Sequence, residues 1–218
     1  GGPVSLVVPI KGKKGQFVIS VGRNIAILTW DGTMGPESKP AEVELGKGSL
    51  FSFSKDLMTP TTHLTNISIA NGLAWTQDRK TMYYIDSLDL SVDALDFDTT
   101  TGKISNRRKA FDFKTNGIDA FPDGMTIDTD GNLWVACFKA GQVIQVNPRT
   151  GQLLSTVSVP SPQTTSVVFG GENLDELYIT SANNHLSQEE QKKYPYAGYT
   201  FRVTGVGAKG YPMEEIQF

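Results

Sequence analysis

The chain has 218 residues, a formal net charge of −3 and one cysteine. This length is sufficient for one large domain with a substantial core, and we expect residues 1–218 to form a single domain. The slightly acidic composition lacks the basic surface typical of a nucleic-acid-binding protein, and no apolar run approaches the ~20 residues that cross a membrane. A lone cysteine cannot form an internal disulfide and Gly1-Gly2-Pro3 does not begin a signal peptide, so a cytoplasmic protein is expected.

The first quarter of the chain predicts short strands separated by turns. Runs rich in β-branched and aromatic residues favour strands. The expected strands are Val4–Pro9, Gln16–Val21, Ile25–Trp30 and Ser49–Phe53. Gly22-Arg23-Asn24 predicts a hairpin between the second and third of them, whereas residues 31–48 show no clear periodicity.

A repeated pattern fills the rest of the chain. The first strands of its three copies are expected at 71–75, 123–127 and 165–169, and the second strands at 82–86, 133–136 and 177–180. A period of roughly 40–50 residues with four short strands is typical of the blades of a β-propeller, because packing the sheets around an axis covers their apolar faces. At ~45 residues a blade, about five would fit, so the sequence predicts an all-β propeller that is incomplete as given.

The stretch around Asp123 predicts a carboxylate held in a defined place. Pro122 fixes the backbone before it, and we expect Gly124 to let the chain bend tightly after it. A hairpin follows, with its turn at Asp130-Gly131-Asn132. A carboxylate at the start of such a strand can serve as a metal ligand or as a base.

Other motifs carry no chemistry. Asp128–Asn132 resembles the start of a calcium-binding EF-hand loop, but its glycine comes one place early and position 12 is Lys139 rather than Glu, so we expect a hairpin turn. No G-x-S-x-G, P-loop or H-E-x-x-H motif occurs, and His63 and His185 are too few for a His-rich zinc site. Ser187–Lys193 is the one stretch that favours a helix, and its polarity indicates a surface insertion.

Asn71 and Asp123 stand at equivalent places in two copies of the repeat. The first strand of each blade lines the central channel of a propeller, so both side chains are expected at one end of that channel. Amide and carboxylate oxygens suit a hard cation such as calcium or magnesium and tolerate zinc or manganese. Either residue alone is more typical of a turn, and their matching places in the repeat make a ligand role equally plausible. Two ligands are too few for tight binding, so at least one further carboxylate is expected.

Several stretches resemble the regucalcin, or senescence marker protein, family, and especially its arthropod branch, which includes luciferin-regenerating enzyme. They are A-N-G-L-A-W (70–75), M-Y-Y-I-D-S (82–87), I-S-N-R-R (104–108), P-D-G-M-T-I-D (122–128), G-N-L-W-V-A (131–136), F-G-G-E-N-L-D-E-L-Y-I-T-S-A (169–182) and R-V-T-G-V-G-A-K-G (202–210). The resemblance covers nearly the whole chain. It implies a six-bladed β-propeller and the metal-dependent hydrolysis of sugar lactones such as gluconolactone.

The resemblance also implies roles for individual residues. In the family, the Asn of an N-G-L-x-W motif and the Asp of a P-D-G motif bind one divalent cation, which implies Asn71 and Asp123 as ligands here. It implies Asp123 as the general base, with the lactone carbonyl oxygen on the cation and a nearby water as nucleophile. Glu37 matches an acidic residue near the family's substrate lid and is expected to contact the substrate. Calcium is the expected cation, with zinc, manganese and magnesium as alternatives.

The chain departs from the family pattern at two places. The family's third ligand is a Glu in an N-terminal strand, and nothing upstream of Val4 supplies it. The family's R-x-N-D-G loop, whose Arg and Asn hold the substrate, is missing where Trp30-Asp31-Gly32 runs into Thr33-Met34. Two alternatives to a lactonase therefore stay open: a non-catalytic calcium-binding regulatory protein, and a specialised enzyme of the luciferin-regenerating type.

Overall fold

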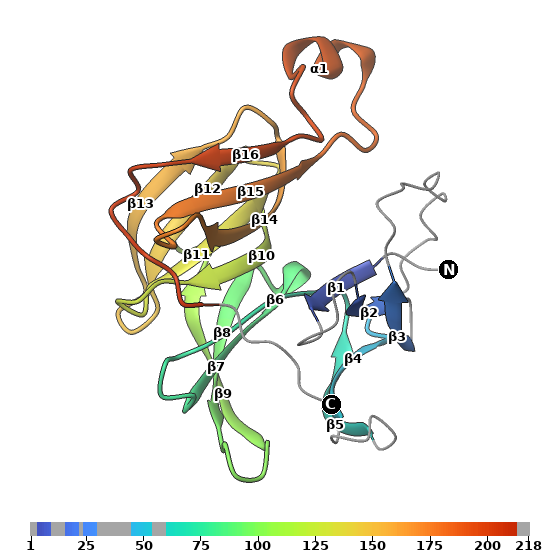
Figure 1. Ribbon diagram of the computed structural model, residues 1–218, viewed down its shortest axis with the longest axis vertical. Coiled ribbons are helices and arrows are strands. Elements are labelled where there is room, and N and C mark those ends of the chain that lie inside the picture. The colour runs from blue at the N-terminus through green and yellow to red at the C-terminus, as the bar shows by residue number, and fades with distance from the viewer. Residues whose placement is uncertain (1–3, 10–15, 22–23, 30–44, 54–59, 213–218) are drawn as a thin grey trace. The chain divides into compact units, whose positions relative to one another are not determined.

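The computed structural model describes residues 4–9, 16–21, 24–29, 45–53 and 60–212 (Figure 1). Contacts divide the chain into two compact units. The smaller unit comprises Gly1–Glu44, Phe53–Thr61 and Pro212–Phe218, and the larger comprises Leu45–Ser52 and Thr62–Tyr211. Each unit is described by itself, and a single domain over residues 1–218 stays a prediction.

The smaller unit holds a three-stranded antiparallel sheet. Its strands, in spatial order, are β1 (Val4–Pro9), β2 (Gln16–Val21) and β3 (Asn24–Thr29). The predicted hairpin is confirmed, and its second strand begins and ends one residue earlier than the sequence indicated. A separate two-stranded sheet pairs β4 (Gly48–Phe53) with β5 (Pro60–Ile67).

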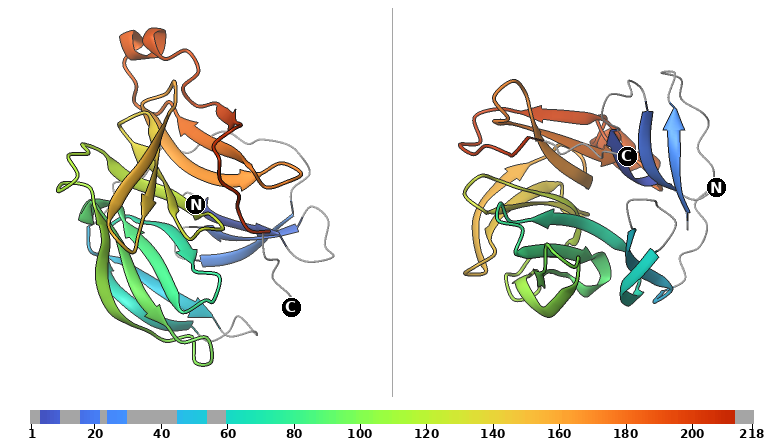
Figure 2. Two further views of the ribbon diagram at one scale, coloured as in Figure 1. Left: turned by 90° about the vertical axis from the view of Figure 1, so that its left-hand side faces the viewer. Right: turned by 60° about the horizontal axis from the view of Figure 1, so that its bottom comes forward.

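Three successive antiparallel groups of strands, here called the first, second and third sheets, make up most of the larger unit, and they match the three predicted copies (Figures 1 and 2). The second and third are joined into one seven-stranded sheet by a single pair of residues, Phe138 and Gln163. The first sheet consists of β6 (Ala70–Trp75), β7 (Thr81–Asp86), β8 (Ser91–Phe97) and β9 (Ile104–Asp112). The second consists of β10 (Phe121–Ile127), β11 (Leu133–Phe138), β12 (Gln142–Asn147) and β13 (Gln152–Ser158). The third consists of β14 (Gln163–Gly170), β15 (Glu176–Ala182) and β16 (Thr200–Val203).

The core lies between these sheets. One cluster of buried side chains packs the first sheet on the second, with Phe111 and Val135 among its members. Another packs the second sheet on the third, where the Trp134 and Phe169 rings meet edge to face with centroids 5.8 Å apart. Each sheet therefore covers an apolar face of its neighbour, which is the burial that the repeat predicted.

The all-β class is confirmed. Among the described residues, the elements other than strands are the 3₁₀ helix η1 (Ser87–Asp89) and the α-helix α1 (Gln188–Lys193). The Ser187 side chain caps α1, which confirms the predicted polar helix. No helix in the described part of the chain is long and apolar enough to cross a membrane. The count of six blades stays a prediction.

Asp128 organises the hairpin turn that resembled a calcium-binding loop. Its side chain is 1% exposed and accepts hydrogen bonds from the backbone of Asn132 (2.8 Å), from Trp134 Nε1 (2.9 Å) and from Gln145 Nε2 (3.0 Å). These donors satisfy a buried carboxylate without a cation. The prediction of a structural hairpin turn is therefore confirmed.

Candidate functional site

The first strand of each sheet in the larger unit carries a β-bulge at the same place. In β6, β10 and β14, the pairing register shifts between residues 70 and 73, 122 and 125, and 164 and 166. The shifted segments contain Asn71, Asp123 and Thr165. A bulge adds one residue to a strand and changes the direction of the side chain there. The two predicted site residues thus share one backbone distortion with Thr165.

The first strands also approach one another very closely. A β-carbon built on Gly72 in β6 would lie 2.8 Å from the backbone oxygen of Asp123 in β10. A β-carbon built on Gly124 in β10 would lie 2.3 Å from Ser166 Oγ in β14. Neither glycine has a left-handed φ angle. The expectation that Gly124 serves to bend the chain is therefore corrected, because the residue is small to admit the neighbouring strand.

Asn71 and Asp123 come together where β6 and β10 meet, and both are half-buried. The Asn71 side chain lies close enough to Asp123 to stabilise its charged carboxylate, and Asn71 Nδ2 donates a hydrogen bond to Ser87 Oγ at 3.2 Å. One sheet therefore supplies the amide and its support, and the next supplies the carboxylate. Their function as cation ligands stays a prediction.

Burial changes the acidity of Asp123. It raises the pKa of this carboxyl from 3.8 to about 6, against the opposing effects of the Asn71 side chain and the Gly124 backbone, which both stabilise the charged form. A carboxyl with such a pKa is mostly ionised at neutral pH, and it is a better proton acceptor than an ordinary aspartate. Asp123 is thus suited to act as a ligand or as a base.

The pair fits a hard divalent cation, because amide and carboxylate oxygens are typical ligands of calcium and magnesium. Among the residues that the structure describes, no group of three or more His, Cys, Asp or Glu side chains could hold a metal ion. Glu37, the predicted substrate contact, lies outside the described residues, as does the Asp31–Met34 junction. Further ligands would therefore come from other parts of the protein or from water.

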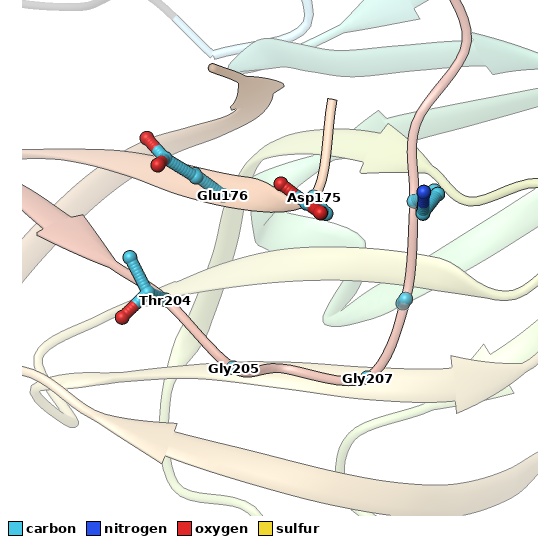
Figure 3. Close-up of a pocket in the computed structure, with 7 residues that line it drawn as sticks. Asp175, Glu176, Thr204, Gly205 and Gly207 are labelled. Atoms are coloured by element: carbon cyan, nitrogen blue, oxygen red, sulfur yellow. The ribbon is translucent and has the colours of Figure 1, made fainter. Parts of the chain in front are cut away.

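One cavity of the larger unit lies at the opposite end of the third sheet from its bulge. Its volume is about 450 Å³, and Figure 3 shows Asp175 and Glu176 among its lining residues. The register places Glu176 opposite Gly170, whereas the bulge falls beside Thr164. Glu176 is already paired with Arg202, which leaves one free carboxylate in the lining. We therefore take the Asn71–Asp123 pair as the candidate site.

A second cavity of about 390 Å³ is lined by charged side chains of the first sheet. Arg107 bridges Asp89, at 2.8 Å, and the buried Asp93. Lys109 pairs with Asp112, just outside the lining. Because these charges pair with one another, the cavity offers little unpaired charge for a ligand.

Sequence reasoning missed two residues of the site. Thr165 begins the first strand of the third predicted copy, in the place that Asn71 and Asp123 take in the other two, but it was not predicted as a site residue. No pattern in the sequence points to Ser87, because its contact with Asn71 depends on how β6 pairs with β7 across the bulge.

Comparisons with known proteins agree with the fold. The family described as SMP-30/Gluconolactonase/LRE-like region matches residues 4–183. Regucalcin of Gallus gallus is 39% identical over 232 residues, covering 92% of this chain and 77% of its own length. The solved structure of a luciferin-regenerating enzyme is 38% identical with a TM-score of 0.86, covering all of this chain and 83% of that one. A calcium-binding regucalcin from Agrobacterium tumefaciens, 23% identical with a TM-score of 0.80 over 95% and 77% of the two chains, shares the fold.

Proposed function

The chain belongs to the SMP-30/gluconolactonase/LRE-like family, and on this premise we propose that it is a divalent-cation-dependent hydrolase of sugar lactones. One observation carries the proposal beyond the family. The Asn71 amide and the Asp123 carboxylate lie side by side, on bulged first strands of neighbouring sheets. This arrangement supports a small-molecule site with an oxygen-ligated cation.

In the proposed reaction, Asn71 and Asp123 hold the cation through their side-chain oxygens. When bound, the cation supplies Lewis acidity that polarises the lactone carbonyl. Asp123 accepts a proton from the water that attacks the carbonyl carbon. The bond between that carbon and the ring oxygen then breaks, and the proton passes to the ring oxygen, so that the product is an open-chain hydroxy acid. Burial raises the pKa of Asp123 to about 6 in the cation-free protein, and a bound cation would lower that pKa again because it favours the charged carboxylate.

A second candidate is non-catalytic calcium binding. The observation that favours it is the donor set, because an amide and a carboxylate side by side offer the oxygen ligands that calcium prefers. A related enzyme of the luciferin-regenerating type is the third candidate, because that structure is similar to this chain over its whole length. All three candidates use the same pair of residues and differ in what happens after cation binding.

Acid release from gluconolactone tests the proposal directly. The purified protein would be freed of metal with a chelator and assayed with calcium, zinc, manganese or magnesium added singly. We expect cation-dependent release of acid that Asp123→Asn abolishes and Asp119→Asn, an exposed change four residues away, preserves. Cation binding without turnover would favour the calcium-binding candidate, and no binding of any cation would reject both.

A further inference from the structure

The hydroxyl of Ser87 is in hydrogen-bond contact with the Asn71 side chain. Ser87 is 4% exposed, and its Oγ accepts a hydrogen bond of 3.2 Å from Asn71 Nδ2. It is the first residue of η1, immediately after β7, so it belongs to the same sheet as Asn71. A serine hydroxyl can accept from an amide NH₂ group or donate to an amide oxygen, and here it accepts, so the Asn71 oxygen is turned away from Ser87.

Ser87 is itself held in a fixed position. The neighbouring Asp86 is 5% exposed and accepts hydrogen bonds from the backbone N–H groups of Ser68 (2.8 Å) and Ile69 (2.9 Å). Asp86 also caps η1 by accepting from Leu88 N. The Ser87 N–H donates to the Ile69 carbonyl at 3.0 Å. These bonds link the end of β7 to the segment that enters β6, so they hold the Ser87 hydroxyl beside Asn71.

An asparagine ligand needs such a support. Its amide has an oxygen on one side, which can bind a cation, and an NH₂ group on the other, which cannot. The two orientations differ by a rotation of the amide group and are similar in shape. An amide whose nitrogen is bonded to Ser87 turns its oxygen away from Ser87. Residues that orient a ligand in this way affect metal affinity without touching the metal.

We propose that Ser87 is a positioning residue that orients the Asn71 amide so that its oxygen is presented to the cation. The inference rests on the proposed function, because it takes Asn71 as a ligand. Ser87 contacts neither the cation nor the substrate in this assignment.

The test is calcium titration by calorimetry on the purified wild-type protein and on Ser87→Ala. We expect the dissociation constant of Ser87→Ala to rise about 10- to 100-fold, the usual effect of losing a residue that orients a ligand. The matched control is Ser91→Ala in the same sheet. Ser91 is 1% exposed and its Oγ donates to Asp93 at 3.1 Å, so Ser91→Ala also loses one hydrogen bond of a buried hydroxyl. Its calcium affinity should remain within about twofold of wild type, while its melting temperature falls as much as that of Ser87→Ala.

A second background separates positioning from a general structural effect. In Asn71→Asp both terminal atoms are oxygens, so orientation no longer matters, and adding Ser87→Ala should change calcium affinity by less than about threefold. Three results would overturn the role of Ser87 and leave the proposed function standing. Ser87→Ala could weaken calcium binding equally in the wild-type and Asn71→Asp backgrounds, Ser91→Ala could weaken it as much as Ser87→Ala does, or Ser87→Ala could leave it unchanged. A wild-type protein that binds no cation would overturn the proposed function and this inference together.

Discussion

Gly124 and Ser166 touch across the junction of β10 and β14, so closely that a β-carbon on residue 124 would lie 2.3 Å from Ser166 Oγ and 2.9 Å from Ser166 Cα. The three atoms nearest to that β-carbon all belong to Ser166, two of them to its side chain and one to its backbone. The contact lies next to Asp123, so the separation of the two strands sets the position of the candidate base. Any side chain at 124 would push the strands apart.

Gly124→Ala should therefore lower the free energy of unfolding by about 1–3 kcal/mol through overpacking. It should also lower the turnover of the protein that remains folded, because the displaced strand carries Asp123. Urea denaturation and gluconolactone turnover measure the two effects. Combining it with Ser166→Gly should recover part of both losses, since the substitution removes the hydroxyl and the β-carbon but leaves the backbone contact. If the double variant is no better than Gly124→Ala, the two residues are not coupled as the structure indicates.

Replacing Asp123 should separate activity from stability. We expect Asp123→Asn to lower kcat/KM about 100- to 10,000-fold, the usual contribution of a general base. Its melting temperature without cation should stay the same or rise, because burial disfavours the charged carboxylate, as the raised pKa of this group shows. A large drop in melting temperature would instead indicate that Asp123 holds the fold together.

Thr165 occupies the bulge of the third sheet, is half-buried, and lies with its hydroxyl 2.8 Å from that of Thr180. If it contacts a sugar hydroxyl of the lactone, Thr165→Val should raise KM about 2- to 10-fold, the value of one hydrogen bond, with little change in kcat. Thr156→Val, on an outer strand of the second sheet, is the control. An unchanged KM in Thr165→Val would remove this residue from the substrate site.

Asp128 should matter for stability and leave cation binding unaffected. Asp128→Asn replaces one acceptor oxygen by a donor facing Trp134, Gln145 and backbone N–H groups, and we expect it to cost about 3 kcal/mol of unfolding free energy. Chemical denaturation would measure this loss, with Asp130→Asn on the exposed part of the turn as control. A weaker calcium affinity in folded Asp128→Asn would restore the reading of this loop as a cation site.

Cys137 should be unreactive until the protein unfolds. Burial raises the pKa of its thiol to about 12, so almost no thiolate forms at pH 8, and the side chain is 0% exposed. Iodoacetamide labelling followed by mass spectrometry should find the thiol unmodified in the native protein and alkylated in urea. The contribution of this shift to stability is present below the unfolded pKa near 9 and is lost as the pH rises toward 12, so Cys137→Ala should be less sensitive to alkali. Rapid labelling under native conditions would contradict the buried position.

The strands and the repeat could be predicted from the sequence because both depend on local patterns. Hairpin turns such as Asp130-Gly131-Asn132 and the capped helix at 187–193 are specified by residues that are neighbours in the chain. The pairing of Asn71 with Asp123 followed from their equivalent places in the repeat. The reason for Gly124 and the contact of Ser87 could not be predicted, because both depend on where a separate strand comes to lie.

The recurrence of one bulge in β6, β10 and β14 has a consequence for how this fold diversifies. The backbone there accepts an amide, a carboxylate and a hydroxyl in turn, at Asn71, Asp123 and Thr165, with a register shift of one residue in each ladder. Ligand chemistry can thus be exchanged by point mutation at a position whose geometry is inherited from the repeat. Related chains can acquire new substrates one sheet at a time while the core that holds them together stays the same.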